Sequence, residues 1–358
     1  MKTNRLILFL ALALLVVTLS ACGGAPTAVT WPGLAASGDA AYLANGSVVY
    51  AVRLSDGQQL WTFPEKPDAK LTFYTNPVLT SDGQLLIGSS GGDHSLFLVD
   101  AANGQSNWSF SGAKDHWVAS PLVDGNMVYA PNADGSLYVF DLTIPGQDKL
   151  TDTVQLGGKL WSQPVMAGGR IFVASLDHRI HSLDLKTLKE MNTTFLGGAI
   201  AGVPALGEGQ LYLGSFDSAM VAINAADGSV AWTAPVKSWI WGGPLLAGNT
   251  LYFGDLDGNF YSVNAADGAI LDTFKPDGAI LATPLFLNGQ VIFVTENGSV
   301  YSLTPGQSPL SLEKLDAKIY TAPVSAGDLI LVAPFQGDAL LVALDKDGKQ
   351  AWTFTPQK

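Results

Sequence analysis

Apolar and polar residues alternate along this chain in short runs, and turns rich in glycine, aspartate and asparagine separate the runs. Clear examples are residues 137–140 (LYVF), 211–214 (LYLG), 251–254 (LYFG) and 260–263 (FYSV). Strands of about five residues with such turns between them are typical of antiparallel sheets. The alternation therefore predicts an all-β protein.

The strand pattern repeats, and each repeat contains one proline in similar apolar surroundings. The prolines follow one another at intervals of 39 to 45 residues. They are Pro32, Pro77, Pro121, Pro164, Pro204, Pro244, Pro284 and Pro323. We call them the inner prolines. Because proline gives no ladder hydrogen bond, each is expected at the end of a strand or at an irregular position.

Four strands in every 40 to 45 residues are the signature of a β-propeller blade. One four-stranded sheet cannot bury both of its faces, whereas a ring of sheets can. Separate β-sandwich domains, the main alternative, need roughly 100 residues each. The sequence predicts an eight-bladed β-propeller of four-stranded antiparallel blades over residues 29–358, in which strand exchange between the termini is not required.

A turn motif with tryptophan four residues after its glycine recurs between the third and fourth strands. A tryptophan late in the fourth strand can lie against the neighbouring blade and bury a large area. The docking residues predicted in this way are Trp61, Trp108, Trp232 and Trp352. The other four repeats have Leu150, Met191, Asp272 and Leu310 at this position.

These turns resemble the PQQ-like repeat of quinoprotein-type propellers over about residues 29–356. Quinoprotein dehydrogenases of that family stack the quinone beneath a vicinal disulfide and bind Ca²⁺ through carboxylates. This chain is much shorter than those enzymes and has one cysteine in all, Cys22. The resemblance therefore implies the fold and no PQQ cofactor, with a degenerate quinoprotein as an alternative.

The lipid-anchored, eight-bladed BamB-like family resembles the chain in length, repeats and N-terminus. In that family, segments before two inner prolines contact an assembly machine through Leu-x-Leu-Arg and Asp-x-Asp patterns. The corresponding segments here are 198–203 (GAIAGV) and 238–243 (SWIWGG), and they differ from both patterns. The resemblance implies a non-enzymatic envelope scaffold that binds a protein or peptide partner, and it leaves that partner unnamed.

The N-terminus reads as a targeting signal. Residues 1–5 carry two positive charges, and residues 6–19 are apolar over a length short of a membrane span. Leu19-Ser20-Ala21-Cys22 resembles a bacterial lipobox. We predict a signal peptide over residues 1–21, a lipidated Cys22 with a tether over residues 22–28, and an extracytoplasmic, membrane-anchored mature protein. The alternative is an ordinary secretory signal with a chance cysteine.

Charge and local motifs narrow the functional classes. The net charge of −12 argues against nucleic acid or an anionic membrane surface as the main partner. His178 and His181 are three apart, which points them to opposite faces of a strand, so no metal site is predicted. Residues 255–259 (DLDGN) resemble part of a Ca²⁺ loop but lack its distal glutamate and read as a hairpin turn. No catalytic constellation is found.

The five residues before each inner proline, which we call the rim segments, carry the best candidate site. Residues four before the proline are apolar in repeats two to eight, whereas residues three and five before it share the opposite face and are mixed. That face is expected at the entrance of the central channel, with Trp31 beside it. The predicted binding residues are Tyr74, His116, Trp117, Lys159, Trp161, Trp239, Trp241, Lys318 and Tyr320.

Aromatic residues dominate binding hot spots, which favours a protein or peptide partner. Aromatics on a concave face also suit a small ligand or a glycan, and we keep that alternative open. The bland alternative is that these aromatic residues only pack between blades.

Overall fold

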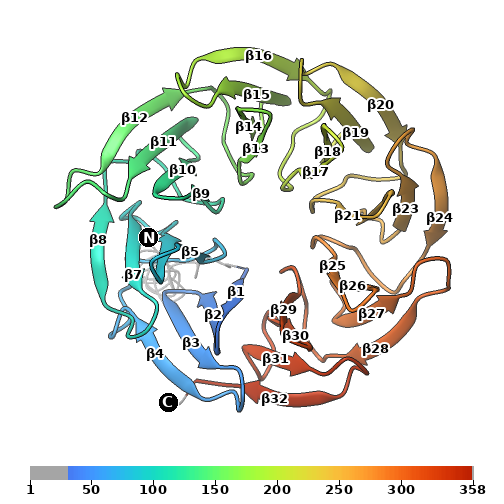
Figure 1. The fold of residues 1–358 in the computed structure, drawn as a ribbon. Helices are drawn as coiled ribbons and strands as arrows, with labels where there is room; N and C mark the ends of the chain where they lie inside the picture. Colours follow the sequence, from blue (N-terminus) through green and yellow to red (C-terminus); the bar gives the residue numbers. More distant parts are fainter. Residues whose placement is uncertain (1–30, 357–358) are drawn as a thin grey trace, which may run out of the picture.

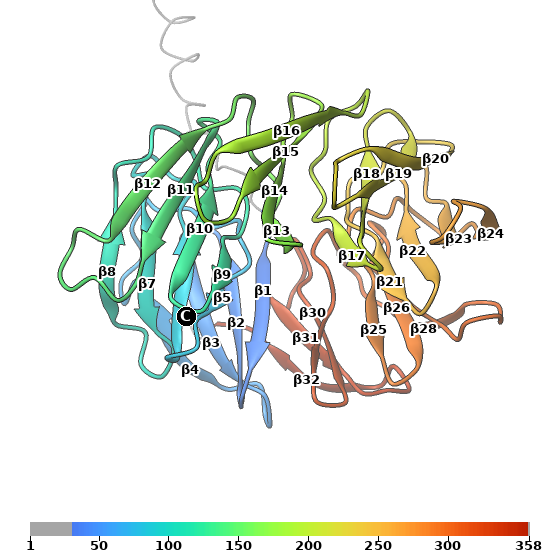
Figure 2. The ribbon, with the colours of Figure 1, turned by 45° about the horizontal axis from the view of Figure 1, so that its top comes forward.

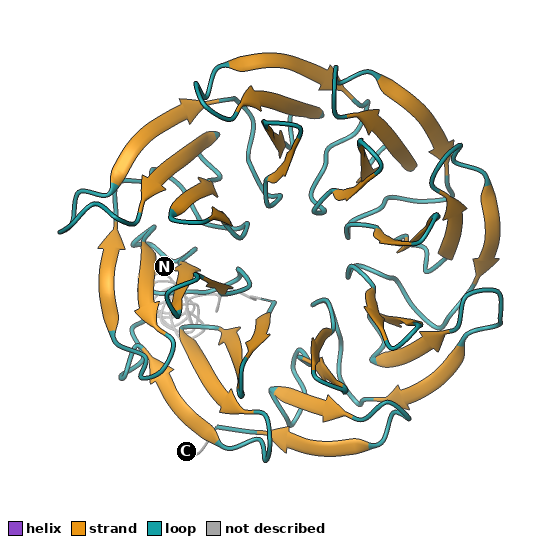
Figure 3. Cartoon of the chain, in the orientation of Figure 1, coloured by secondary structure: helices purple, strands orange, loops and turns teal. Residues whose placement is uncertain are grey.

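The computed structural model describes residues 31–356, which form eight four-stranded antiparallel sheets arranged as a closed ring (Figure 1). The described residues consist of strands and connecting loops (Figure 3). The predicted all-β, eight-bladed propeller is confirmed. The predicted signal peptide and Cys22 lie outside the described residues.

The first half of the chain forms blades 1 to 4. Their strands are β1 (Gly33–Ser37), β2 (Ala40–Asn45), β3 (Val48–Arg53), β4 (Gln59–Phe63), β5 (Val78–Leu79), β6 (Gln84–Gly88), β7 (Leu96–Asp100), β8 (Ser106–Phe110), β9 (Leu122–Asp124), β10 (Met127–Pro131), β11 (Ser136–Asp141), β12 (Leu150–Gln155), β13 (Val165–Ala167), β14 (Arg170–Ala174), β15 (Arg179–Asp184) and β16 (Glu190–Phe195).

Blades 5 to 8 complete the ring. Their strands are β17 (Ala205–Gly207), β18 (Gln210–Ser215), β19 (Ala219–Asn224), β20 (Val230–Pro235), β21 (Leu245–Ala247), β22 (Thr250–Gly254), β23 (Phe260–Asn264), β24 (Ile270–Phe274), β25 (Leu285–Leu287), β26 (Gln290–Val294), β27 (Ser299–Leu303), β28 (Leu310–Lys314), β29 (Val324–Ala326), β30 (Leu329–Val332), β31 (Leu341–Leu344) and β32 (Gln350–Phe354).

Strand order follows the sequence within every blade, with the first strand nearest the channel and the fourth on the outside (Figure 1). Each innermost strand begins directly after an inner proline, as β9 does after Pro121. The rim segments therefore connect the outer strand of one blade to the inner strand of the next. The strands cross the thickness of the ring (Figure 2), so all rim segments lie at the same end of the channel.

The core of the protein is divided among the blade interfaces. Eight clusters of buried apolar side chains occur among the described residues, and each joins two neighbouring blades. Between blades 1 and 2, Val49 and Ala51 pack with Leu85 and Ile87, all fully buried. Every sheet thus buries both faces against its neighbours, which is why the blades are stable as a ring.

The ring closes by side-chain packing between blades 8 and 1, and within residues 31–356 no strand is exchanged. The Trp352 indole N–H donates to the Leu54 carbonyl at 2.7 Å. Tyr50 and Phe354 meet edge-on with ring centroids 5.4 Å apart. The Thr321 hydroxyl donates to the Pro32 carbonyl.

The four docking tryptophans all bond to the following blade. Their indole N–H groups donate to carbonyls in its turn between the third and fourth strands, at 2.7 to 3.0 Å. The acceptors of Trp61, Trp108, Trp232 and Trp352 are Ala101, Gln147, Ala265 and Leu54. The glycine of the receiving turn lies under the ring in three cases, with Gly104 under Trp61 as the example.

Three residues aligned with the docking position do not occupy it. In blade 3, Leu150 lies before the bulge and packs in the cluster between blades 2 and 3, while Asp152 has the register of Trp232. In blade 4, a β-bulge in the pairing of the third and fourth strands leaves Met191 opposite no partner and 51% exposed, and Asn192 instead contacts Gly228 of the next blade. In blade 7, Leu310 is 64% exposed, and Leu312 packs against Gly348. The blades that carry docking tryptophans have the same bulge, so the bulge alone does not explain the misalignment. In blade 4 the turn has no glycine, and Leu188 takes the positive φ there, with Asn192 four residues after it. In blade 7 the bulge lies further from the turn, between Val300 and Tyr301.

The part of the chain that the structure describes contains no apolar helix of membrane-spanning length.

Candidate functional site

The rim segments enclose a cavity of about 650 Å³ at one end of the central channel. The seven described residues that lie three before an inner proline all line it: Tyr74, Val118, Trp161, Ala201, Trp241, Leu281 and Tyr320. We call this set the channel ring. The volume of the cavity is in the range of small-molecule and peptide side-chain sites, and the walls of the cavity are mainly apolar.

The residues four before the inner prolines point the other way, into the blade interfaces. They are Phe73, Trp117, Leu160, Ile200, Ile240, Ile280 and Ile319, and each is at most 1% exposed. Their burial fixes the direction of the channel ring, because successive side chains of an extended segment point to opposite sides.

Trp117 differs from the other predicted binding residues, since it belongs to this buried set. It is 1% exposed, and its indole N–H donates to the His94 carbonyl at 2.8 Å. It packs with Phe140 and Leu86 between blades 2 and 3. Trp117 is therefore a core residue, and its predicted position at the rim is wrong.

The remaining predicted residues fall into two groups. Tyr74, His116, Lys159, Trp161, Trp241 and Tyr320 line the cavity. Trp239 and Lys318 lie outside its lining on the same rim, and both are about half exposed. The residues five before the inner prolines therefore contribute to the cavity in blades 3 and 4 and to the outer rim elsewhere.

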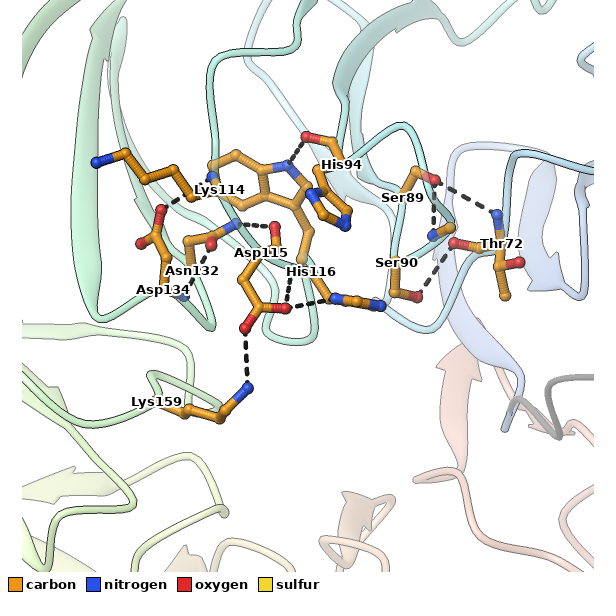
Figure 4. Close-up of polar contacts among 12 residues, drawn as sticks. Thr72, Ser89, Ser90, His94, Lys114, Asp115, His116, Asn132, Asp134 and Lys159 are labelled. Carbon is orange, nitrogen blue, oxygen red and sulfur yellow. Dashed lines mark hydrogen bonds and ion pairs between the residues drawn. The ribbon is translucent and has the colours of Figure 1, made fainter.

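A charged network occupies the side of the cavity formed by blades 3 and 4 (Figure 4). The Asp115 carboxylate accepts hydrogen bonds from Lys159 Nζ at 2.8 Å, His116 Nδ1 at 2.5 Å and the His116 backbone N–H at 2.8 Å. Lys159 reaches Asp115 from the next blade, so the ion pair joins two blades. The buried Asn132 side chain donates to the Asp115 carbonyl at 3.0 Å and holds this turn in place.

The Asp115 carboxylate is ionised over the physiological range. Partial burial raises its pKa, but the hydrogen bonds from Lys159 and His116 outweigh that effect and hold the pKa well below its ordinary value. Asp115 was absent from the predicted site, although its position beside His116 was a usable signal.

Aromatic rings form the opposite side of the cavity, toward blades 6 to 8. Trp31 stacks on Tyr320 with centroids 4.9 Å apart and meets Trp241 edge-on at 5.5 Å. Trp241 in turn stacks on Phe216 at 5.2 Å. The cavity is thus polarised, with an ionic side and an aromatic side.

Tyr320 is fixed by a second ion pair at the rim. Glu296 accepts hydrogen bonds from Lys318 Nζ at 2.5 Å and from the Tyr320 hydroxyl at 3.0 Å. The bond from Lys318 lowers the pKa of Glu296, while burial and then Glu296 raise the pKa of Tyr320. These contacts hold the Tyr320 ring in one orientation.

One buried donor in the lining is left without a partner. The Trp161 indole N–H has no hydrogen-bond acceptor among residues 31–356. An unpaired buried donor costs free energy, and this nitrogen is buried behind the ring rather than exposed to the cavity. The surface of the lining offers ring faces and the Lys159 ammonium, which suit binding.

The lining does not fit a PQQ site. It has one carboxylate, Asp115, which Lys159 and His116 already engage, and it has no cysteine. Among the described residues, no group of three or more His, Cys, Asp or Glu side chains could hold a metal ion.

The fold and the channel ring define the class of protein: an eight-bladed propeller built from PQQ-like repeats. The family model described as outer membrane protein assembly factor BamB matches residues 44–145, 145–239 and 235–311. The chain belongs to this family.

Two solved structures are similar to the chain. The first is BamB from Moraxella catarrhalis, with a TM-score of 0.74 and 15% identity over 87% of this chain and 94% of that one. The second is the computationally designed Ika8 protein, with a TM-score of 0.72 and 16% identity over 89% of this chain and 98% of that one. Such identities show a shared fold. No curated protein sequence matches the chain.

Proposed function

We propose that this protein is a non-enzymatic, lipid-anchored scaffold of the cell envelope that holds a protein or peptide partner at the channel cavity. The observation that carries this proposal is the polarised cavity, to which each of seven rim segments contributes at least the residue three before its inner proline. Membership of the BamB family supports an envelope role and a protein partner. Trp239, which is exposed on the rim beside the cavity, extends the candidate surface.

The tether predicted from the sequence sets the orientation of this site. Eight residues lie between Cys22 and Trp31, and the nine Cα–Cα steps from one to the other span at most about 30 Å. A lipid on Cys22 would therefore keep the cavity end of the ring near the membrane. The partner would be held close to the membrane surface.

A small ligand or glycan is the second candidate, and the concave shape of the cavity favours it. A volume of about 650 Å³ is ordinary for a small-molecule site. Flat aromatic faces can also stack on a sugar or another planar ligand.

Site-specific photo-crosslinking in the native envelope tests the proposal. In one variant a photoreactive residue replaces His116, whose side chain lines the cavity and is 47% exposed. In the matched control it replaces Lys346, whose side chain is 67% exposed in the turn between β31 and β32. We expect a discrete crosslinked protein from the His116 position, lost in a Trp161→Ala/Trp241→Ala background. Identical products from both positions would contradict a scaffold site at the cavity.

Native mass spectrometry of the same membrane preparations separates the two candidates. A bound small molecule without any protein crosslink at the cavity would support the second candidate and overturn the first.

A further inference from the structure

Trp31 occupies a place in the cavity that no other repeat fills in the same way. It is the residue directly before Pro32 and belongs to no strand. The corresponding residues of the other repeats are smaller and not aromatic: Asn76, Ser120, Gln163, Val203, Gly243, Thr283 and Ala322. Its ring reaches Tyr320 of blade 8 and, beyond Leu281 of blade 7, Trp241 of blade 6.

The attachment of Trp31 is weaker than that of the docking tryptophans. Each docking tryptophan donates an indole hydrogen bond to the next blade. Trp31 has ring contacts with Tyr320 and Trp241, and its indole N–H donates to no described residue. The two aromatic pairs favour the seated ring by a factor of about 5 to 150 beyond the contribution of the apolar area that it buries, and a competitor that makes the same contacts can displace it.

The aromatic surface continues outward from the cavity. Phe216 is sandwiched between Trp241 at 5.2 Å and Trp239 at 5.3 Å, with interplanar angles of 23° and 7°. Trp239 is 51% exposed. An extended segment can therefore run from the rim to the cavity across stacked rings.

We propose that the aromatic side of the cavity binds an aromatic side chain of the protein partner, and that Trp31 is the resident occupant which this side chain displaces. The inference rests on the proposed function and names the chemistry of its ligand. The evidence is that the chain's own indole already sits between Tyr320 and Trp241.

Binding of N-acetyl-L-tryptophanamide to the intact protein tests this exchange, with N-acetyl-L-alaninamide as the matched probe. Because Trp31 leaves only a fraction of the cavities open, removing it raises the apparent affinity by the inverse of that open fraction. Trp31→Ala should tighten binding of the tryptophan probe at least about 5-fold. Trp31→Ala/Trp241→Ala should lose that gain, and the alanine probe should not respond.

Two further variants guard against trivial outcomes. Trp232→Ala opens an indole-sized gap at a docking site, so an equal gain there would overturn the proposal. Trp31→Phe keeps a smaller ring, and it should give an intermediate gain even where Trp31→Ala fails to fold. Unchanged affinity in a folded Trp31 variant would also overturn it. A partner crosslinked at His116 together with unchanged probe affinity would refute the exchange alone and leave the scaffold proposal standing.

Discussion

The contact between Gly104 and Trp61 gives a quantitative test of how the blades dock. Gly104 has φ +76°, and a methyl group on its Cα would lie 2.7 Å from Trp61 Cε3. Gly125 is the matched control, because it has φ +59° in a turn where an added methyl meets nothing within 4 Å. Both substitutions to alanine strain the backbone, and Gly104→Ala alone also forces the indole out of its place.

The two effects add at Gly104. A left-handed backbone costs a non-glycine residue about 1–2 kcal/mol, and overpacking costs about 1–3 kcal/mol. Gly104→Ala should therefore lower the free energy of unfolding by about 2–5 kcal/mol, and Gly125→Ala by about 1–2 kcal/mol.

Urea unfolding followed by far-UV circular dichroism measures both values, together with a double-mutant cycle through Trp61→Ala. With the indole removed, Gly104→Ala should cost no more than Gly125→Ala. Equal costs for the two glycine variants in the wild-type background, or a Gly104→Ala cost that is unaffected by Trp61→Ala, would refute the docking account.

Three further outcomes follow from the same contacts. Trp352→Ala should lower the free energy of unfolding by about 2–4 kcal/mol, because it opens the ring at its closure. The rim variant Trp239→Ala should lower it by about 1 kcal/mol or less in the same urea titration. Equal losses for the two variants would argue against closure through Trp352. Asp115→Asn should destabilise the protein at pH 7 and progressively less below about pH 4, because a carboxyl with a lowered pKa stabilises the fold when ionised; a pH-independent difference in melting temperature would contradict the Lys159 pairing. Saturating PQQ with Ca²⁺ should leave the melting temperature unchanged, and a clear rise would revive a quinone site.

The fold and the channel ring were predictable because they follow from a repeated local rule. The inner prolines mark the start of each innermost strand, and alternation then sends the residues four and three before them to opposite sides. Ile240 and Trp241 show this directly, with Ile240 fully buried and Trp241 in the cavity lining. Trp117 was predicted wrongly because a tryptophan at a rim suggests binding, whereas its position four residues before Pro121 places it in the core.

The rest of the site depends on contacts between repeats, which the local pattern does not contain. Trp31 was set beside the rim from the sequence, but its stacking on Tyr320 joins residues almost 300 positions apart. The pairing of Asp115 with Lys159 likewise joins two blades. The blade 4 turn has no glycine to count from, because Leu188 takes the positive φ at that position, so the docking role of Asn192 was missed.

Fluorine NMR of the protein labelled with 5-fluorotryptophan tests the central claim, that the cavity is the binding site. The nine tryptophans include cavity residues and buried residues, so each spectrum contains its own control. Adding N-acetyl-L-tryptophanamide should shift the resonances of Trp31, Trp161 and Trp241. The resonances of the core and docking residues Trp61, Trp108, Trp117, Trp232 and Trp352 should stay in place. Shifts confined to the core and docking residues, or no shift at a saturating probe concentration, would contradict the account.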